Sequence, residues 1–176
     1  MRYSYFPGCS LEATARSYGV STEAVCNALD IELEELEDWN CCGATAFYSI
    51  DELLALSLAA RNLAMAEKEG RDLVVSCSGC YITLEKANVT LRDYPALKAE
   101  VDEVLAEAGL EYHGGVKVRH ILEILINDVG LEAIKANVTK ELRGLRVAPY
   151  YGCQIVRPSL GFDHPELPQS LDRLIE

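Results

Sequence analysis

The sequence predicts an α/β fold in which layers of helices pack on a largely parallel sheet. Short runs rich in β-branched and aromatic residues alternate with longer segments of helical periodicity, which is the order of elements in such folds. Cysteines follow several of these runs, and open α/β sheets bind ligands beyond the carboxyl ends of their strands. At 176 residues, of which 49% are hydrophobic, the chain is long enough to bury the core of one such domain.

Five segments are predicted as strands because they are short, apolar or alternating, and bounded by turn residues or cysteines. In chain order these are 3–6, 31–33, 73–75, 116–118 and 145–150. Four of them lead to a cysteine or to a cysteine-bearing loop, so the cysteine ligands are expected on loops at the carboxyl ends of strands.

Start and stop signals divide the remaining sequence into helices. Ser21 is the expected N-cap of a helix that ends at Leu29, with Val25 and Cys26 on its buried face. A capping box at 49–52 opens a helix that Gly70 closes. Its expected buried positions are Leu53, Leu54, Leu56, Leu58, Ala60 and Leu63. Further helices are expected at 79–89, 95–109, 121–129 and 165–175, the second of them burying Leu97, Val101, Val104 and Ala108.

Five of the seven cysteines form one pattern, namely Cys9, the adjacent pair Cys41-Cys42, and Cys77 and Cys80 of a Cys-x-x-Cys motif. Adjacent cysteines rarely form a disulfide with each other, because their Cα atoms are only about 3.8 Å apart. Five thiolates also exceed the ligands of one tetrahedral zinc ion, whereas an iron–sulfur cluster takes soft thiolates at several irons. The pattern therefore predicts an iron–sulfur cluster, with a structural zinc site or buried cysteines that bind nothing as the alternatives.

Charge and cysteine usage disfavour several other classes of protein. The net charge of −12 argues against nucleic acid and anionic membranes as partners. No apolar run has the length of a membrane span and no signal-peptide core follows Met1, so a cytoplasmic protein that is not integral to a membrane is expected. The odd cysteine count favours metal or redox use over a disulfide framework. Without a G-x-G-x-x-G fingerprint, the chain must receive electrons from a partner.

The sequence also echoes itself. Residues 5–9 (Tyr-Phe-Pro-Gly-Cys) resemble residues 149–153 (Pro-Tyr-Tyr-Gly-Cys), in each case after a strand-like run. The echo predicts a first module over residues 1–144 and the start of a second over 145–176. The second module has Cys153 without a Cys-Cys pair or a Cys-x-x-Cys motif of its own, so we expect it to be truncated.

The cysteines and their surroundings resemble the CCG cysteine-rich domain found in the B subunit of heterodisulfide reductase and its bacterial relatives. The resemblance rests on residues 6–10 (Phe-Pro-Gly-Cys-Ser), residues 36–43 (Leu-Glu-Asp-Trp-Asn-Cys-Cys-Gly) and the Cys-x-x-Cys motif. It implies that a noncubane [4Fe–4S] cluster is bound by Cys9, Cys41, Cys42, Cys77 and Cys80, and that Cys153 is the first ligand of a second cluster. CCG domains also occur in complexes that oxidise glycolate, lactate, glycerol-3-phosphate or succinate. A non-catalytic electron-transfer subunit of a flavin-linked dehydrogenase is therefore the alternative.

The family resemblance also implies a substrate and partners. In that family the heterodisulfide of coenzymes M and B binds between two clusters and is cleaved by one electron from each. A flavin-containing A subunit supplies those electrons through a ferredoxin-like C subunit. In bacteria that make no methane, another disulfide or a redox protein would be the substrate. Because only one cysteine set is complete, we expect this chain to be inactive alone.

The remaining candidate residues are interpreted as structural. Cys26 is expected to be a buried core thiol, and His120 to cap or pack under an apolar helix. His113 is expected in a loop and His164 at a helix entry. Trp39 is expected either to shield the cysteine loop from water or to pack as a core aromatic. The acidic run at 32–38 is expected to be a solvated edge.

Overall fold

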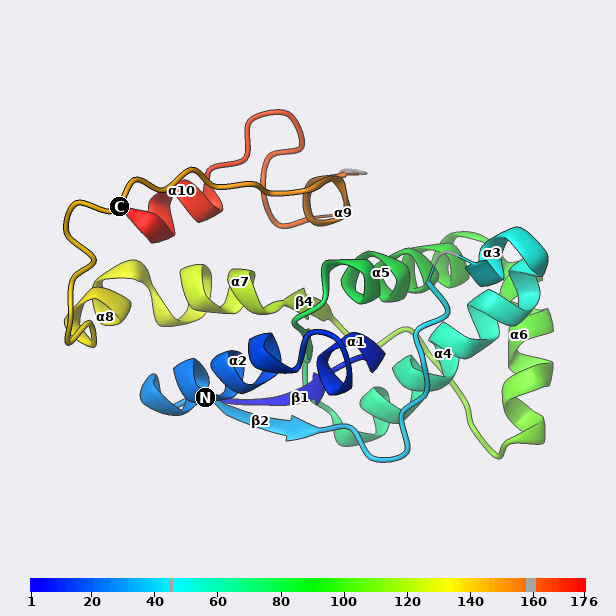
Figure 1. Cartoon of the computed structure of the whole chain (residues 1–176). Helices are drawn as coiled ribbons and strands as arrows, with labels where there is room; N and C mark the ends of the chain where they lie inside the picture. The colour runs from blue at the N-terminus through cyan, green and yellow to red at the C-terminus, as the bar shows by residue number, and fades with distance from the viewer. Residues whose placement is uncertain (45, 158–160) are drawn as a thin grey trace.

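The fold is built on a four-stranded parallel sheet with the strand order β2-β1-β3-β4 (Figure 1). The computed structural model describes residues 1–44, 46–157 and 161–176. The strands are β1 (Arg2–Phe6), β2 (Glu32–Glu35), β3 (Leu73–Val75) and β4 (Val118–His120), and every pairing between neighbours is parallel. The predicted α/β class and parallel sheet are therefore confirmed.

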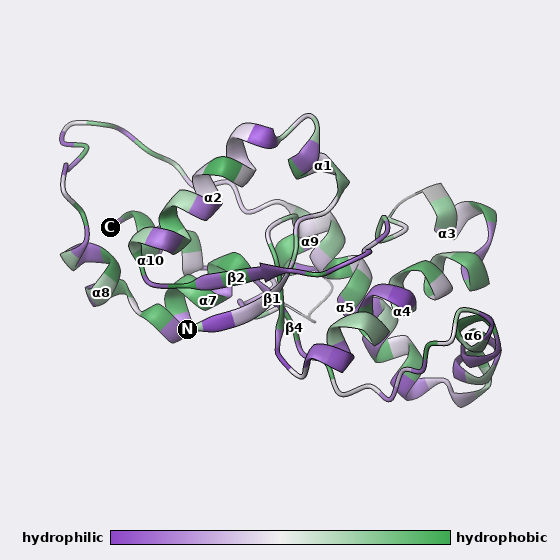
Figure 2. Cartoon of the chain, turned by 90° about the horizontal axis from the view of Figure 1, so that it is seen from below, coloured by the Kyte–Doolittle hydropathy of each residue, from purple (hydrophilic) through white to green (hydrophobic). Residues whose placement is uncertain are grey.

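Helices cover both faces of the sheet. They are α1 (Cys9–Glu12), α2 (Arg16–Ala28), α3 (Ala46–Ile50), α4 (Glu52–Glu69), α5 (Ser78–Asp93), α6 (Pro95–Glu107), α7 (Ile121–Ile124), the π-helix η1 (Leu125–Val129), α8 (Leu131–Ala136), α9 (Cys153–Val156) and α10 (Ser170–Ile175). In α4, for example, the apolar residues Leu56, Ala60 and Leu63 are buried in the core against the sheet. Figure 2 shows how hydrophobic and hydrophilic residues alternate along the helices.

Two hydrophobic cores lie on opposite faces of the sheet. Alternation along β1 directs Phe6 to one face and Tyr3 and Tyr5 to the other, because successive strand side chains point to opposite sides. Phe6 joins the larger core with residues of α4, α5 and α6. Tyr3 and Tyr5 join the smaller core with residues of α1, α2 and α7. The result is three layers, helix on sheet on helix.

The topology creates a crevice between the carboxyl ends of β1 and β3. These two strands are neighbours in the sheet. The chain leaves β1 into α1 and α2 on one face, and it leaves β3 into α5 on the other. Adjacent strands whose connections diverge in this way form the topological switch point at which open α/β sheets bind ligands.

The first half of the chain departs from the predicted boundaries at two helix starts. The helix assigned to begin at Ser21 begins at Arg16 instead, and its added first turn brings Gly19 against Leu11 of α1. Val25, predicted buried, is 42% exposed, whereas Cys26 is buried as expected. The N-cap of α4 is Asp51 rather than Ser49, and its carboxylate accepts a hydrogen bond from Leu54 N.

Other helix predictions hold in outline and fail at particular residues. Gly70 ends α4 in the left-handed conformation, as predicted. Leu54 of α4 and Val104 of α6 are exposed although both were expected to be buried. In α6 the buried positions are Val101 and Leu105, so Ala108 also lies outside the core. The strand expected at 116–118 forms two residues later, as β4.

The C-terminal segment differs most from the prediction. Residues 145–150 form no strand and are largely exposed, because no described strand pairs with them and an isolated strand leaves its backbone groups without partners. The helix expected to begin at Pro165 begins at Ser170, where the Asp163 carboxylate accepts hydrogen bonds from Gln169 N and Ser170 N. Helix α8 was not predicted.

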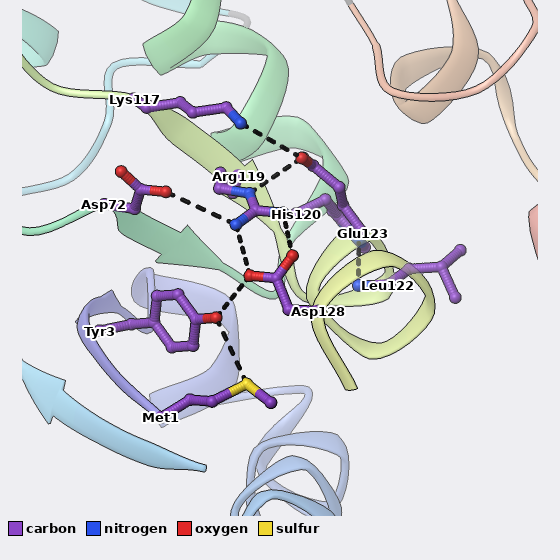
Figure 3. Close-up of polar contacts among 9 residues, drawn as sticks. All are labelled: Met1, Tyr3, Asp72, Lys117, Arg119, His120, Leu122, Glu123 and Asp128. Carbon is purple, nitrogen blue, oxygen red and sulfur yellow. Dashed lines mark hydrogen bonds and ion pairs between the residues drawn. The ribbon is translucent and has the colours of Figure 1, made fainter. Parts of the chain in front are cut away.

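A buried ion network ties β4 to the elements around it (Figure 3). The Arg119 guanidinium donates hydrogen bonds to Glu123 at 2.8 Å and to both carboxylate oxygens of Asp128 at 2.6 and 2.8 Å. The Tyr3 hydroxyl donates to the same Asp128 carboxylate at 2.6 Å, which connects η1 to β1. Among the described residues, no helix combines the length and the apolarity needed to cross a membrane.

Candidate metal centre

The five cysteines of the predicted pattern gather beyond the carboxyl end of the sheet. Cys9 begins α1 just after β1, and Cys77 is the N-cap of α5 just after β3. Cys80 lies in the first turn of α5. Cys41 and Cys42 lie in the loop that follows β2. Strands β1 and β3 thus deliver their cysteines to the two sides of the switch-point crevice.

The thiols of these cysteines form a continuous series of contacts. Cys9 donates a hydrogen bond to Cys41, and Cys41 contacts Cys42. The Cys80 thiol lies within hydrogen-bonding reach of both Cys42 and Cys77 and so joins the adjacent pair to the Cys-x-x-Cys motif. Within the described ranges, no three histidine, cysteine, aspartate or glutamate side chains converge on a single ion position. All five cysteines are nevertheless brought together, as the sequence pattern predicts.

Hydrogen bonding divides the thiols into easily and poorly ionised ones. The Cys80 thiol, helped by the backbone N–H groups of Cys80 and Gly79, lowers the pKa of Cys77 to about 5 against the opposing effect of burial. The same thiol lowers the pKa of Cys42 to about 7. Hydrogen bonding with Cys42 and with Cys77 raises the pKa of Cys80. Burial, followed by the charge of Cys41, raises the pKa of Cys9. Thiolates bind metal, so Cys77 and Cys42 are ready ligands at neutral pH.

Gly8 provides space for a sulfur atom. Its backbone has φ 76° and ψ 153°, a conformation that side chains with a Cβ rarely adopt. A Cβ added there would lie 2.9 Å from Cys80 Sγ, closer than van der Waals contact allows. Glycine is therefore required at this position both by the backbone and by the close approach of Cys80.

A clamp of polar residues holds the loop that carries the adjacent cysteine pair. Asn62 of α4 accepts a hydrogen bond from Asn40 N and donates one to Asn40 O, both at 3.0 Å. Arg61 Nη1 donates to Asn40 Oδ1 at 3.0 Å. Sequence reasoning missed these residues. In the sequence, Asn62 is a polar residue between the apolar positions Ala60 and Leu63, and this interruption of an apolar helix face was the signal that could have found it. Asn62 is fully buried in the structure, where a polar side chain requires hydrogen-bond partners.

Trp39 and Phe6 form an aromatic wall beside the same loop. Their ring centroids are 5.3 Å apart in an edge-to-face arrangement, and Trp39 Nε1 donates to Glu35 at 2.9 Å. Trp39 is half-buried against the larger core, so the expected packing role is confirmed and the shielding role stays a prediction. The acidic strand β2 is an edge of the sheet, and its Glu34 pairs with Arg2 and Arg71 at 2.9 and 2.8 Å.

The other two cysteines lie apart from this series of contacts. Cys26 is buried in the smaller core, where burial raises its pKa to about 11, so the predicted core role is confirmed. Cys153 is exposed and begins α9. The preceding Gly152 has φ 72° and ψ 159°, close to the values of Gly8, so the sequence echo extends to the backbone conformation of these glycines.

The histidines occupy structural positions. His120 caps α7, because its Nδ1 accepts a hydrogen bond from Leu122 N at 3.1 Å, and burial lowers its pKa to about 4. Its Nε2 lies 3.4 Å from Ser78 Oγ, next to Cys77. His113 lies in an exposed loop. His164 accepts hydrogen bonds from Glu166 N and Leu167 N ahead of α10. These positions agree with the predicted structural roles.

The chain matches known proteins of the cysteine-rich class. Residues 3–85 match the model of the CCG cysteine-rich domain family. The B subunit of the ferredoxin/F420H2-dependent CoB-CoM heterodisulfide reductase of Methanosarcina acetivorans is 35% identical over 99% of this chain and 59% of its own length. A protein of Archaeoglobus profundus that is named as similar to the heterodisulfide reductase B subunit is 36% identical over 90% of this chain and 54% of its own.

A third relative has a different name. The membrane anchor subunit of the 8-methylmenaquinol:fumarate reductase of Wolinella succinogenes is 36% identical over 99% of this chain and 61% of its own length. The chain thus spans between 54% and 61% of these curated relatives. All three names denote a reductase or a reductase-like protein.

Proposed function

Residues 3–85 belong to the CCG cysteine-rich domain family, and on that premise we propose that the chain binds an iron–sulfur cluster and transfers electrons within a reductase complex. The observation that carries the proposal is the series of five thiols at the switch point of the sheet. Soft thiolates from several loops are the ligand set that iron–sulfur clusters take in proteins.

We propose that the ligands are Cys9, Cys41, Cys42, Cys77 and Cys80, and that the cluster is a noncubane [4Fe–4S] centre. When bound, such a cluster supplies one-electron chemistry. The chain's own residues prepare the site. Cys77 and Cys42 ionise most easily, the clamp of Asn40, Arg61 and Asn62 fixes the adjacent pair, and Gly8 leaves space beside Cys80. We further propose that the Trp39 and Phe6 rings, which pack edge to face beside the loop, would limit the access of water to the cluster.

For the complex as a whole, we propose reduction of a disulfide. The names of the Methanosarcina and Archaeoglobus relatives support this, and CoM-S-S-CoB would be the substrate in a methanogen. A flavin-containing A subunit would supply the electrons through a ferredoxin-like C subunit, and the location would be cytoplasmic. The second candidate is an electron-transfer subunit of a flavin-linked dehydrogenase complex that cleaves no disulfide. The similarity to a fumarate reductase subunit favours it.

We also propose that a second CCG module begins at residue 145, after a first module over residues 1–144. The matching backbone of Gly8 and Gly152, each of which precedes a cysteine that opens a short helix, supports this division. Cys153 would be the first ligand of a second cluster. Because Cys153 is the only cysteine after Cys80, this chain would hold one cluster and accept electrons without completing disulfide cleavage.

Electron transfer and disulfide turnover can be tested separately. The anaerobically reconstituted chain is mixed with reduced ferredoxin, and its visible absorbance is followed before and after addition of CoM-S-S-CoB. The proposal predicts reversible reduction without disulfide turnover, with the Methanosarcina relative, in its complex, as the positive control. Cys42→Ser should abolish the reduction and Cys26→Ser should preserve it. A chain that takes up cluster and accepts no electrons would refute the electron-transfer role, and rapid disulfide turnover would refute the need for two modules.

A further inference from the structure

Residues 151–157, which include α9, reach back to the first module and pack against α5. Helix α9 packs against α5, and the two lie next to each other in Figure 1. Ile155 and Val156 of α9 are buried with Leu122 of α7. The Phe162 ring stacks on His120, with ring centroids 6.3 Å apart. Helix α9 and Phe162 are therefore held against the first module by α5, β4 and α7.

Gln154 is the polar side chain that this anchoring directs toward the cysteines. A Cβ added to Gly79 would lie 3.4 Å from Gln154 Oε1, 3.8 Å from Gln154 Nε2 and 3.7 Å from Cys77 Sγ. The carboxamide and the Cys77 sulfur thus flank the same point. Gly79 lies between Cys77 and Cys80 and has no side chain to separate the two groups. Rotation about the terminal bond of Gln154 exchanges its carboxamide oxygen and nitrogen, so either the acceptor or the N–H donor can occupy the position nearer Gly79.

We propose that Gln154 is a positioning residue for the cluster, whose carboxamide N–H groups donate to the Cys77 sulfur and raise the reduction potential of the centre. The inference rests on the proposed function. Reduction adds one electron, taken from the titrant, and the extra negative charge spreads onto the sulfur ligands. A hydrogen-bond donor at a sulfur stabilises the reduced state more than the oxidised state. Gln154, a residue of the second module, would in this way tune the reduction potential of the cluster bound by the first module.

The test is a reductive titration of the reconstituted chain, followed by electron paramagnetic resonance. Gln154→Leu removes the donor, and the isosteric Gln154→Glu replaces it with an acceptor that carries a negative charge. Both should lower the reduction potential, and Gln154→Glu should lower it more. The matched control is Gln169→Leu, at the glutamine that precedes α10. Its potential should equal that of the unsubstituted chain.

The outcomes separate this inference from the proposed function. If the chain takes up iron and sulfide and all three variants titrate at the same potential, Gln154 plays no part and only the inference is overturned. A raised potential in Gln154→Glu overturns it as well. If the unsubstituted chain takes up no sulfide, the proposed function fails and the inference fails with it. Gln154→Glu keeps the shape of the side chain, so a shift in this variant reports the lost donor and the added charge rather than packing, and Gln154→Leu reports the loss of the donor without a new charge.

Discussion

Substitution of Gly8 by alanine is predicted to destabilise the metal-free chain for two separable reasons. The first is the backbone, because φ 76° with ψ 153° is a conformation that costs a non-glycine residue about 1–3 kcal/mol. The second is contact, because the new Cβ would lie 2.9 Å from the Sγ of Cys80, which is only 5% exposed and cannot move freely. Overpacking of this kind costs about 1–3 kcal/mol. The expected total is therefore about 2–6 kcal/mol.

Gly152 supplies a matched control. Its φ of 72° and ψ of 159° repeat the Gly8 backbone, and no atom lies within 4 Å of its added Cβ. Gly152→Ala should therefore cost only the backbone part, so the two variants should differ by about 1–3 kcal/mol. Gly109→Ala, with φ 67° and open space, is a second control near the end of α6.

The assay is urea unfolding of the reduced, metal-free proteins, with free energies extrapolated to zero denaturant. A double-mutant cycle isolates the contact, since Gly8→Ala in a Cys80→Ala background removes the sulfur and should leave only the backbone cost. Gly8→Ala should also lower the uptake of iron, because it displaces a ligand. The close approach of Cys80 to Gly8 would be refuted if Gly8→Ala and Gly152→Ala lowered the free energy of unfolding equally. It would also be refuted if the double-mutant cycle gave no coupling energy between positions 8 and 80.

Two further predictions concern the pH dependence of the metal-free chain. Burial lowers the pKa of His120 from its ordinary 6.5 to about 4, so the unfolded chain binds a proton that the folded chain excludes, and stability should fall by roughly 3 kcal/mol between pH 6.5 and pH 4. His120→Asn keeps an N-cap without titrating, so the urea midpoints of this variant should depend less on pH over that range. An unchanged pH dependence in His120→Asn would contradict the burial argument. Hydrogen bonds from Arg119 lower the pKa of Asp128, so its contribution is present above the carboxyl range and is lost as the pH falls through the lowered pKa. Asp128→Asn should cost about 2–3 kcal/mol at pH 7 and progressively less below about pH 4, and a cost that does not depend on pH would show that the network acts by packing alone.

Much of the fold could be predicted because local signals and tertiary structure agree. The run Leu73–Val75 is a buried strand both by its β-branched composition and by its central place in the sheet. Gly70 ends α4 because the left-handed backbone there favours glycine. The cysteine site could be predicted for a related reason, since sequence spacing after strands determines which loops meet at one edge of a parallel sheet.

The failures arise where distant contacts decide the structure. Residues 145–150 have the composition of a strand, yet they pair with no strand in the described ranges and remain largely exposed. Helix α2 begins before its apparent cap at Ser21, and its first turn brings Gly19 against α1, a contact that no local signal reveals. The clamp on the adjacent cysteine pair joins Asn40 to Asn62, which are far apart in the sequence. The periodicity of apolar residues along the sequence does not indicate which polar side chains pair across the fold.

The central claim is that five cysteines hold an iron–sulfur cluster, and its most direct test is chemical analysis of the anaerobically reconstituted chain. Iron, acid-labile sulfide and zinc are measured in the unsubstituted chain and in single cysteine-to-serine variants. We expect about four irons and four sulfides per chain, a large loss at Cys9, Cys41, Cys42, Cys77 or Cys80, and no loss at Cys26 or Cys153. One zinc per chain with no sulfide, or iron uptake that does not depend on these five cysteines, would contradict the claim.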